Sequence, residues 1–245
     1  MAQATERNEQ QPDVLRVFQS KQETKAFYDK ISRVYDLLAD KSEDPIRQSA
    51  LALLAVREGE QVLEIGFGTG RCLVALARAV GSTGRVFGID LSDGMRWRAE
   101  GNLYHTGLSN RVELQTGDAC ALPYAAATFS AVFMTFTLEL FDTPEIPQVL
   151  AECWRVLQPG GRIAIAGMSK EDENGVLLHV FEWTHQHFPN FLDCRPIFVQ
   201  RALEAAGFHP TQCQKQTMWV PVEIILAQKP GGLLLADGKQ QQAVN

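Results

Sequence analysis

The sequence has 245 residues, 45% of them hydrophobic, with 29 acidic against 23 basic side chains and a formal net charge of -6. A chain of this length can bury a substantial core, and we predict one domain with additions. The acidic balance argues against nucleic-acid binding through a general basic surface, because phosphate contacts need clustered Lys and Arg. No apolar run approaches the roughly 20 residues of a membrane span, and the N-terminus lacks the layout of a signal peptide. We therefore expect a soluble cytoplasmic protein.

The cysteines and histidines do not form a recognisable framework. Five cysteines are scattered singly without a CxxC pair, so the sequence predicts neither a disulfide framework nor a zinc knuckle. They are Cys72, Cys120, Cys153, Cys194 and Cys213. His179, His185 and His187 lie six and two residues apart, and neither spacing stacks ligands on one helical face. We expect reduced cysteines and no metal site.

The N-terminal part divides into a leader and a helical region. Residues 1–20 are rich in Gln, Glu and Asn with little periodicity, which predicts a flexible leader. Helical patterns follow at residues 23–40 and 44–56, and we expect capping helices over residues 21–58, ahead of a sheet. Their spacing places several apolar side chains on one common face. These side chains are Phe27, Ile31, Val34, Leu37 and Leu38.

Short apolar runs alternate with helical patterns over the middle of the chain. The predicted strands are residues 61–66, 84–90, 111–118, 129–136 and 162–168, and the predicted helices run from Arg71 to about Val80, Asp93 to His105 and Pro144 to Leu157. The stretch QPGG before the fifth strand predicts a turn. Because parallel strands need right-handed helical crossovers, this order predicts an α/β fold. We expect a doubly wound, mostly parallel sheet with a ligand crevice at the carboxyl ends of its strands.

A long segment at residues 169–195 follows the fifth strand, and insertions of this length are usually functional or mobile. We expect it to form a lid or substrate-binding insertion. Large aromatic side chains there and on a late strand would line a pocket for a flat or apolar ligand, or pack beneath the lid. They are Phe181, Trp183, Phe188, Phe191 and Trp219. The remaining expected elements are a helix over 196–208, strands at 209–216 and 217–229, and a loose tail over 229–245 that follows a single domain spanning 21–228.

Residues 62–70 read VLEIGFGTG, with three glycines at alternate positions. A nicotinamide, a nucleotide phosphate and a sulfonium cofactor are all candidates for such a loop. The third glycine comes one residue earlier than in the GxGxxG pattern of dinucleotide folds, and the GK[ST] ending of a P-loop is absent. Asp90 follows 20 residues after Gly70, where a carboxylate can accept both hydroxyls of a ribose. Glu64 and Asp118 add negative charge, which favours a cationic cofactor over a pyrophosphate.

Five motifs in this order and spacing resemble the class I S-adenosylmethionine-dependent methyltransferases. They are VLEIGFGTG, VFGIDLS, TGDACALPY, FSAVFMTFTLELF and RVLQPGGRI, and the resemblance runs from Tyr28 to Met168. The stretches RVYDLL and RVLQPGGRI are similar to the branch that contains the ubiquinone and menaquinone biosynthesis C-methyltransferases. The resemblance implies a Rossmann-like, seven-stranded sheet whose seventh strand, within residues 217–229, runs antiparallel.

The resemblance also implies S-adenosylmethionine as cofactor and assigns its contacts position by position. Glu64 and the loop glycines would form the floor under the methionine part, while Asp90 would hold the ribose. Asp118 would accept a hydrogen bond from the adenine amino group, and residues just past the fourth strand would approach the sulfonium. The expected cofactor-binding residues are Tyr28, Tyr35, Glu64, Gly66, Phe67, Gly68, Gly70, Asp90, Leu91, Met95, Asp118, Ala119, Cys120, Thr135 and Phe136.

Methyl transfer from a sulfonium is an in-line displacement, so the enzyme contributes mainly alignment of the reactants and exclusion of water. Where the acceptor is a carbon or a hydroxyl, a base must take its proton. Glu139 follows the fourth strand closely, and our hypothesis is that it faces the acceptor. A solvated loop carboxylate is the alternative. His179, His185 and His187 are secondary candidate bases.

One departure from the resemblance concerns the substrate. The quinone methyltransferases continue after YD with Asn, Ser, His and Trp at set spacing, whereas this chain reads YDLLADKSEDPIRQSAL, which puts a quinone in doubt. We predict an S-adenosylmethionine-dependent methyltransferase acting on a small, aromatic or apolar molecule. The accepting atom, whether carbon, nitrogen, oxygen or sulfur, and the oligomeric state stay open. The alternatives are a nicotinamide-dependent oxidoreductase and a cofactor-binding protein without turnover.

Overall fold

The structure, a computed structural model, describes residues 14, 16–17, 19–32, 35–171, 195–218 and 220–231, without the side chains of residues 35–42. Several predictions lie outside these residues. They concern the start of the leader, residues 172–194 of the insertion and the tail beyond residue 231. The individual side chains concerned are Val34, Tyr35, Leu37, Leu38, His179, Phe181, Trp183, His185, His187, Phe188, Phe191, Cys194 and Trp219.

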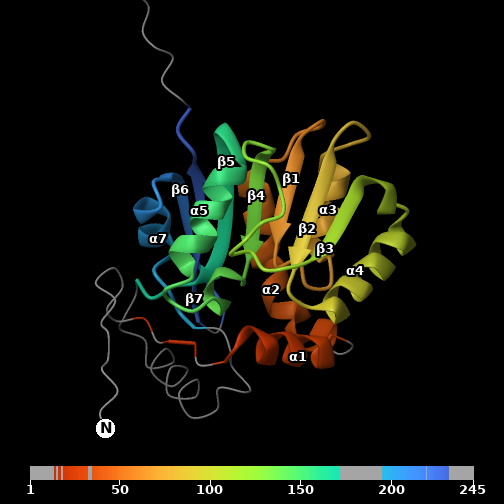
Figure 1. Ribbon diagram of the computed structural model, residues 1–245, viewed down its shortest axis with the longest axis horizontal. Helices are drawn as coiled ribbons and strands as arrows, with labels where there is room; N and C mark the ends of the chain where they lie inside the picture. Colours follow the sequence, from red (N-terminus) through yellow and green to blue (C-terminus); the bar gives the residue numbers. More distant parts are fainter. Residues whose placement is uncertain are drawn as a thin grey trace, which may run out of the picture.

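Seven strands form one sheet in the order β3-β2-β1-β4-β5-β7-β6 (Figure 1). The strands are β1 Gln61–Ile65, β2 Arg85–Asp90, β3 Val112–Thr116, β4 Phe129–Thr135, β5 Leu157–Met168, β6 His209–Thr217 and β7 Pro221–Gln228. The first five pair in parallel, whereas β7 runs antiparallel to both β5 and β6. The predicted doubly wound, mostly parallel seven-stranded sheet is confirmed. The strand order reverses between β1 and β4, where such sheets open a crevice for ligands.

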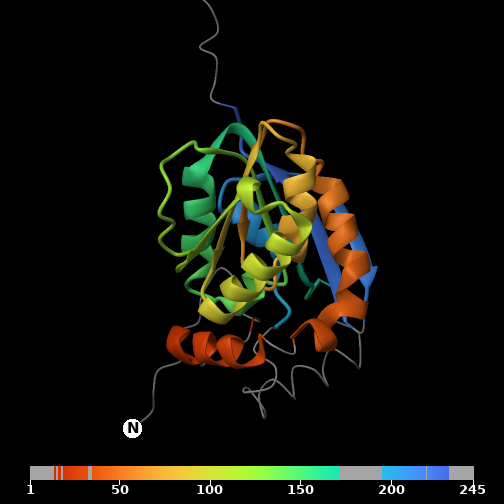
Figure 2. The same ribbon diagram turned by 90° about the vertical axis from the view of Figure 1, so that its right-hand side faces the viewer.

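Helices cover both faces of the sheet (Figure 2). They are α2 Tyr35–Leu54, α3 Arg71–Ala79 and α4 Asp93–Thr106 on one face, and α5 Ile146–Val156 and α7 Val199–Ala205 on the other. Short 3-10 turns lie at η1 Ser109–Arg111 and η2 Leu138–Leu140. Because side chains alternate along a strand, Leu63 and Ile65 pack in the cluster under α5 and α7, whereas Val62 packs under α2 and α3.

The N-terminal helices differ from the two predicted patterns. Helix α1, Lys21–Ile31, ends where Ser32 donates from its backbone N to Tyr28 O and from its hydroxyl to Asp29 O. The second helix, α2, begins at residue 35 and continues through Pro45. The predicted apolar face shared by residues 27–38 therefore does not form on one helix. α1 buries none of its side chains and lies across the carboxyl ends of the strands, whereas α2 packs on the sheet (Figure 1).

Strand β5 starts earlier than predicted. Leu157 pairs with Phe129 and Arg162 pairs with Ala131, with an irregular register between the two pairs. Within that irregular stretch Gly160 has φ +77 and donates its N–H to Lys229 O. The stretch QPGG is thus a bulge inside the strand rather than a turn before it.

Both predicted ends are better anchored than expected. The leader was predicted to be flexible as far as residue 20, yet Val14 is buried in the core and Val17 N donates to Asp142 Oδ1. At the other end, Lys229, which was placed in the tail, donates from Nζ to the carbonyl oxygens of Trp154 and Leu157. The polar composition of these segments did not indicate their specific contacts with the rest of the domain.

Candidate active site

The glycine loop connects β1 to α3, and its three glycines serve different purposes. Gly66, Gly68 and Gly70 all have positive φ, which L side chains rarely adopt. A Cβ on Gly66 would lie 2.3 Å from Thr137, and one on Gly70 would lie 2.8 Å from the Cβ of Ala99 on α4. No atom lies within 4 Å of the Cβ position of Gly68. Gly66 and Gly70 therefore allow close packing, whereas Gly68 presents bare backbone to open space.

Asp90 ends β2 beside this loop. Its Oδ2 accepts from Gly68 N at 2.9 Å and its Oδ1 accepts from Ser92 N at 2.9 Å. Burial raises the pKa of the Asp90 carboxyl, although these backbone donors oppose the rise. Each carboxylate oxygen keeps a lone pair for another donor. The side chain is thus fixed in a position where it could also accept from hydroxyl groups.

A pocket lies at the carboxyl ends of the strands, between the sheet and α1. It contains about 950 Å³ of empty space, part of it open to solvent. Ten of the predicted cofactor-binding residues line it. They are Tyr28, Gly66, Gly68, Asp90, Leu91, Met95, Asp118, Ala119, Thr135 and Phe136.

The other predicted cofactor-binding residues lie behind the pocket wall, apart from Tyr35, whose side chain is not described. Phe67 is buried against Gly88, and Gly70 packs on α4. Cys120 is 7% exposed, and burial raises its pKa to about 11, so the thiol stays protonated at neutral pH. Glu64 is only 2% exposed. These residues support the wall rather than form it.

Glu64 is a buried carboxyl beneath the glycine loop. Its Oε2 has no hydrogen-bond partner among the described residues. Burial raises its pKa well above the ordinary value, Asp90 raises it further, and Arg47 on α2 opposes these effects. A buried acid without a partner is costly, so this position favours a cationic ligand nearby.

Glu139 does not line the pocket. It lies on η2 with no exposed side-chain surface, and its Oε1 accepts from Met168 N at 3.2 Å. Burial raises its pKa to about 7, which backbone donors and Arg195 oppose. The alternative of a solvated loop carboxylate is wrong, because the side chain is packed against Gly167 on β5. The structure therefore gives no support for the hypothesis that Glu139 faces the acceptor.

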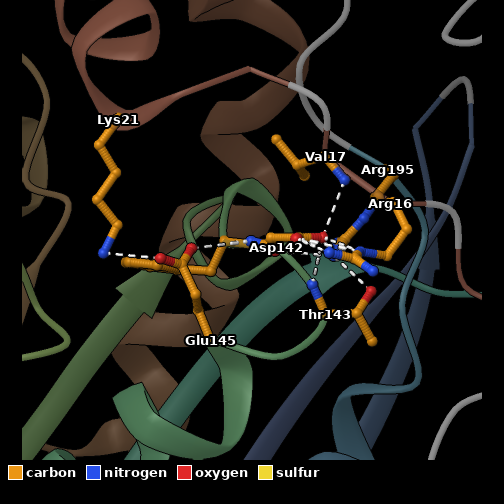
Figure 3. A network of polar contacts seen from close by, with 8 residues as sticks. Arg16, Val17, Lys21, Asp142, Thr143, Glu145 and Arg195 are labelled. Carbon is orange, nitrogen blue, oxygen red and sulfur yellow. Dashed lines mark hydrogen bonds and ion pairs between the residues drawn. The ribbon is translucent and has the colours of Figure 1, made fainter. Parts of the chain in front are cut away.

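Apart from Asp118, the sequence did not indicate the charged residues that link the N-terminal segment to the rest of the domain (Figure 3). Lys21 Nζ lies 2.5 Å from Asp118 Oδ2 and 2.7 Å from Glu145 Oε1, and all three residues line the pocket. Arg16 binds both carboxylate oxygens of Asp142. The capping-box pattern at residues 20–23 could have placed the start of α1 and hence Lys21. No local signal pairs residue 16 with a loop 126 positions away.

These contacts shift the pKa values of the groups involved. Burial alone would lower the pKa of Lys21 and raise that of Asp118. The pairing overcomes burial in both cases, so the pKa of Lys21 is raised and that of Asp118 is lowered. Both groups are therefore charged at neutral pH, and Asp118 already has a cationic partner at the position where the adenine amino group was expected.

Comparison with known proteins agrees with this geometry. Residues 62–161 match the family described as "Methyltransferase domain". A demethylmenaquinone methyltransferase of Lactobacillus johnsonii is 34% identical over 145 residues, which are 59% of this chain and 58% of that protein. A ubiquinone/menaquinone biosynthesis C-methyltransferase of Klebsiella pneumoniae is 36% identical over 115 residues, 47% of this chain and 45% of that protein. The chain thus spans about half the length of the curated relatives it matches.

Solved structures show the same fold. The [4+2]-cyclase SpnF has a TM-score of 0.70 at 17% identity, covering 87% of this chain and 98% of that one. A SAM-dependent methyltransferase from Aquifex aeolicus has a TM-score of 0.58 at 22% identity, covering 83% and 97%. The fold and the glycine-loop site define a Rossmann-like methyltransferase domain. Residues 62–161 match a methyltransferase domain, and the chain is similar to the ubiquinone and menaquinone branch of the class I S-adenosylmethionine-dependent methyltransferases.

No helix among the described residues combines the length and apolar character needed to cross a membrane. Within the same part of the chain, no group of His, Cys, Asp and Glu side chains is arranged to hold a metal ion.

Proposed function

We propose that the protein uses S-adenosylmethionine to methylate a small aromatic or apolar molecule. The observation that carries this proposal is the position of Asp90, which is held by Gly68 N at the switch point of the sheet and lines the pocket. A carboxylate there suits the two hydroxyls of a ribose. The methyltransferase domain match favours this reading over a nicotinamide-dependent oxidoreductase.

Two features fit the charge and shape of this cofactor. The backbone at Gly68 faces open space, so a ligand can approach it closely. Oε2 of the buried Glu64 beneath the loop lacks a hydrogen-bond partner among the described residues, and a cationic ligand would stabilise the ionised form of this carboxyl. A pyrophosphate would instead make the ionisation of Glu64 and Asp90 still more costly.

The chain's own residues would contribute alignment and shielding. When bound, the cofactor supplies an electrophilic methyl group on its sulfonium. Asp90 and the glycine loop would fix the orientation of the nucleoside and methionine parts, and Tyr28 on α1 would cover them. Displacement at a methyl group gains most from correct alignment and from exclusion of water.

The acceptor would lie toward the loop after β4. Leu140 and Phe141 line this side of the pocket, and Val17 lies in the wall formed by the N-terminal segment. Apolar walls of this kind suit a flat or aliphatic molecule. The names of the relatives add a quinone-type ring as the first acceptor to test.

Glu139 is retained only as a residue to test. Its carboxyl is buried and does not line the pocket, and a role as proton acceptor would require it to reach the pocket. Replacement of Glu139 by Gln that leaves the turnover number and its pH profile unchanged would exclude that role. A loss of turnover with unchanged cofactor affinity and stability would support it.

Calorimetry and product detection test the proposal. We expect the protein to bind S-adenosylhomocysteine and not NAD, and to methylate a reduced demethylated naphthoquinone, with the product detected by mass spectrometry. Binding of NAD alone would overturn the proposal in favour of an oxidoreductase. Binding of S-adenosylhomocysteine without methylation of any acceptor in a panel of quinones, phenols and amines would support a cofactor-binding protein without turnover.

A further inference from the structure

The N-terminal segment forms one side of the pocket. We call its described residues, 14, 16–17 and 19–31, the strap. The strap runs along the carboxyl ends of the strands and includes α1, which crosses beneath the sheet in both views (Figures 1 and 2). Its pocket-lining residues are Val17, Gln19, Lys21, Thr24 and Tyr28. A ligand in this pocket would therefore lie between the strap and the strand ends.

Several cations of the strap meet carboxylates of the body. Arg16 pairs with Asp142 at 2.7 Å, and Lys21 bridges Asp118 and Glu145. Figure 3 shows the contacts with Asp142 and Glu145, which both lie on the loop between η2 and α5.

A third cation extends this pattern along α1. Lys25 Nζ lies 2.6 Å from Asp93 Oδ2 at the start of α4. The cations thus come from the strap and the carboxylates from three separate places in the body. Asp29 on α1 is the exception: it pairs with Lys25 and also accepts from Ser92 Oγ at 2.5 Å and from Gly94 N at 2.9 Å.

Apolar packing contributes little to this attachment. No side chain of α1 is buried, and Val14 is the one buried apolar side chain among the described strap residues. The ion pairs are partly exposed, with Lys21 at 39% and Arg16 at 52% side-chain exposure. Partly exposed ion pairs are individually weak and are screened by salt. An element attached in this way opens more easily than one packed into a core.

We propose that the strap is a lid over the cofactor pocket, held closed by the Arg16–Asp142 and Lys21–Glu145 ion pairs, and that it opens when the cofactor exchanges. The proposal rests on the proposed function for the identity of the ligand, but the attachment of the strap can be tested without it. Arg16 and Lys21 act here as positioning residues, since they hold Val17 and Tyr28 against the pocket.

The loop that receives the strap is also held by a residue of the body, which lies beside Arg16 in Figure 3. Arg195, which is fully buried, donates to the carbonyl oxygens of Glu139 and Phe141 and to Thr143 Oγ1. The receiving loop is therefore a fixed part of the body. The strap is the part that moves.

Limited trypsin digestion measures strap opening directly, because Arg16, Lys21 and Lys25 are themselves cleavage positions. Asp142→Asn and Glu145→Gln weaken the attachment without removing those positions, and Asn at 142 keeps an oxygen for the backbone donors. We expect cleavage at the three positions to become about threefold to tenfold faster in each variant. Raising KCl from 0.1 M to 1 M should accelerate cleavage of the wild-type protein more than that of the variants.

Glu60→Gln is the matched control, because it removes the ion pair between Glu60 and Arg162 near the amino-terminal ends of the strands. Global unfolding would speed strap cleavage in this control too, whereas lid opening would not. Equal acceleration in the control and in Glu145→Gln, or no acceleration in either strap variant, would overturn the proposal.

The dissociation rate of S-adenosylhomocysteine, measured by stopped flow, gives the second readout. We expect it to rise about threefold to tenfold in Glu145→Gln and not in Glu60→Gln. An unchanged rate in a variant whose strap is cleaved faster would show that opening does not limit exchange and would overturn the lid. Failure of the wild type to bind S-adenosylhomocysteine would instead refute the proposed function, and the cleavage rates would then decide the attachment of the strap alone.

Discussion

The two N-terminal helices have similar expected roles in the sequence but differ in how they are attached. Helix α2 buries Ile46, Ala50 and Leu54 against the face of the sheet that also carries α3. Helix α1 buries no side chain and is held through Lys21 and Lys25. Hydrophobic burial is strong and insensitive to salt, whereas partly exposed ion pairs are weak and screened. Helix α2 therefore belongs to the body, by which we mean the part of the domain built on the sheet. Helix α1 belongs to the cover of the pocket, which is the strap defined above.

The largest expected effect comes from the core of α2. Leu54→Ala should lower the free energy of unfolding by about 3 kcal/mol, because it leaves a cavity beneath a fully buried side chain. Ile31 is half-buried at the end of α1, so Ile31→Ala should lower the free energy of unfolding by about 1 kcal/mol or less. Urea unfolding followed by circular dichroism measures both. Equal losses would break the distinction between body and cover.

A buried acid in the body should make stability depend on pH. The raised pKa of Glu139, about 7, means that the folded state favours its protonated form. Ionisation of Glu139 lowers the free energy of unfolding. This loss is absent below the unfolded pKa near 4.5, grows as pH rises toward 7, and is constant above 7. Glu139→Gln should therefore gain stability relative to wild type between pH 5 and pH 8, by about 2 to 3 kcal/mol. A difference that does not change with pH would contradict the buried position of this carboxyl.

The affinity for cofactor product should depend on the body more than on the cover. Asp90→Asn keeps an oxygen for one backbone donor but loses the charge and an acceptor for the ribose, so we expect S-adenosylhomocysteine to bind about 10- to 100-fold more weakly. Calorimetry measures the change, and Glu145→Gln on the strap contact is the comparison. A larger loss in Glu145→Gln would mean that the cover supplies most of the affinity.

The sequence predicted the parts of the fold that depend on local patterns. The alternation of apolar runs and helices placed β1 to β4, and the glycine loop with Asp90 indicated the pocket that the structure contains. The strap could not be predicted, because Arg16 finds Asp142 only after the whole domain has folded. The composition of residues 1–20 is that of a disordered leader, and composition does not record specific ion pairs.

The burial of Glu139 was equally hard to predict. Glu139 follows an apolar strand and Glu64 lies within one, and both are buried. Glu64 lies beneath the glycine loop, whereas Glu139 packs against Gly167 on β5 behind the pocket wall. The backbone turn at η2 directs the Glu139 side chain away from the pocket, and no spacing of residues in the sequence predicts the direction of that turn.

The smallest expected effect concerns the start of α1. Ser20 accepts from Glu23 N and the Glu23 side chain accepts from Ser20 N, which forms a capping box just before Lys21. Ser20→Ala should weaken the first turn by about 1 kcal/mol. Because α1 buries no side chain, we expect the change to appear as about fivefold faster amide hydrogen exchange in residues 21–25, with the global free energy of unfolding unchanged within about 0.5 kcal/mol. Ser92→Ala removes the cap of the packed helix α4 together with a donor to Asp29 on α1, and it should lower global stability instead, since α4 is part of the body. A global loss in Ser20→Ala would show that the cover folds together with the body and is not a separate unit.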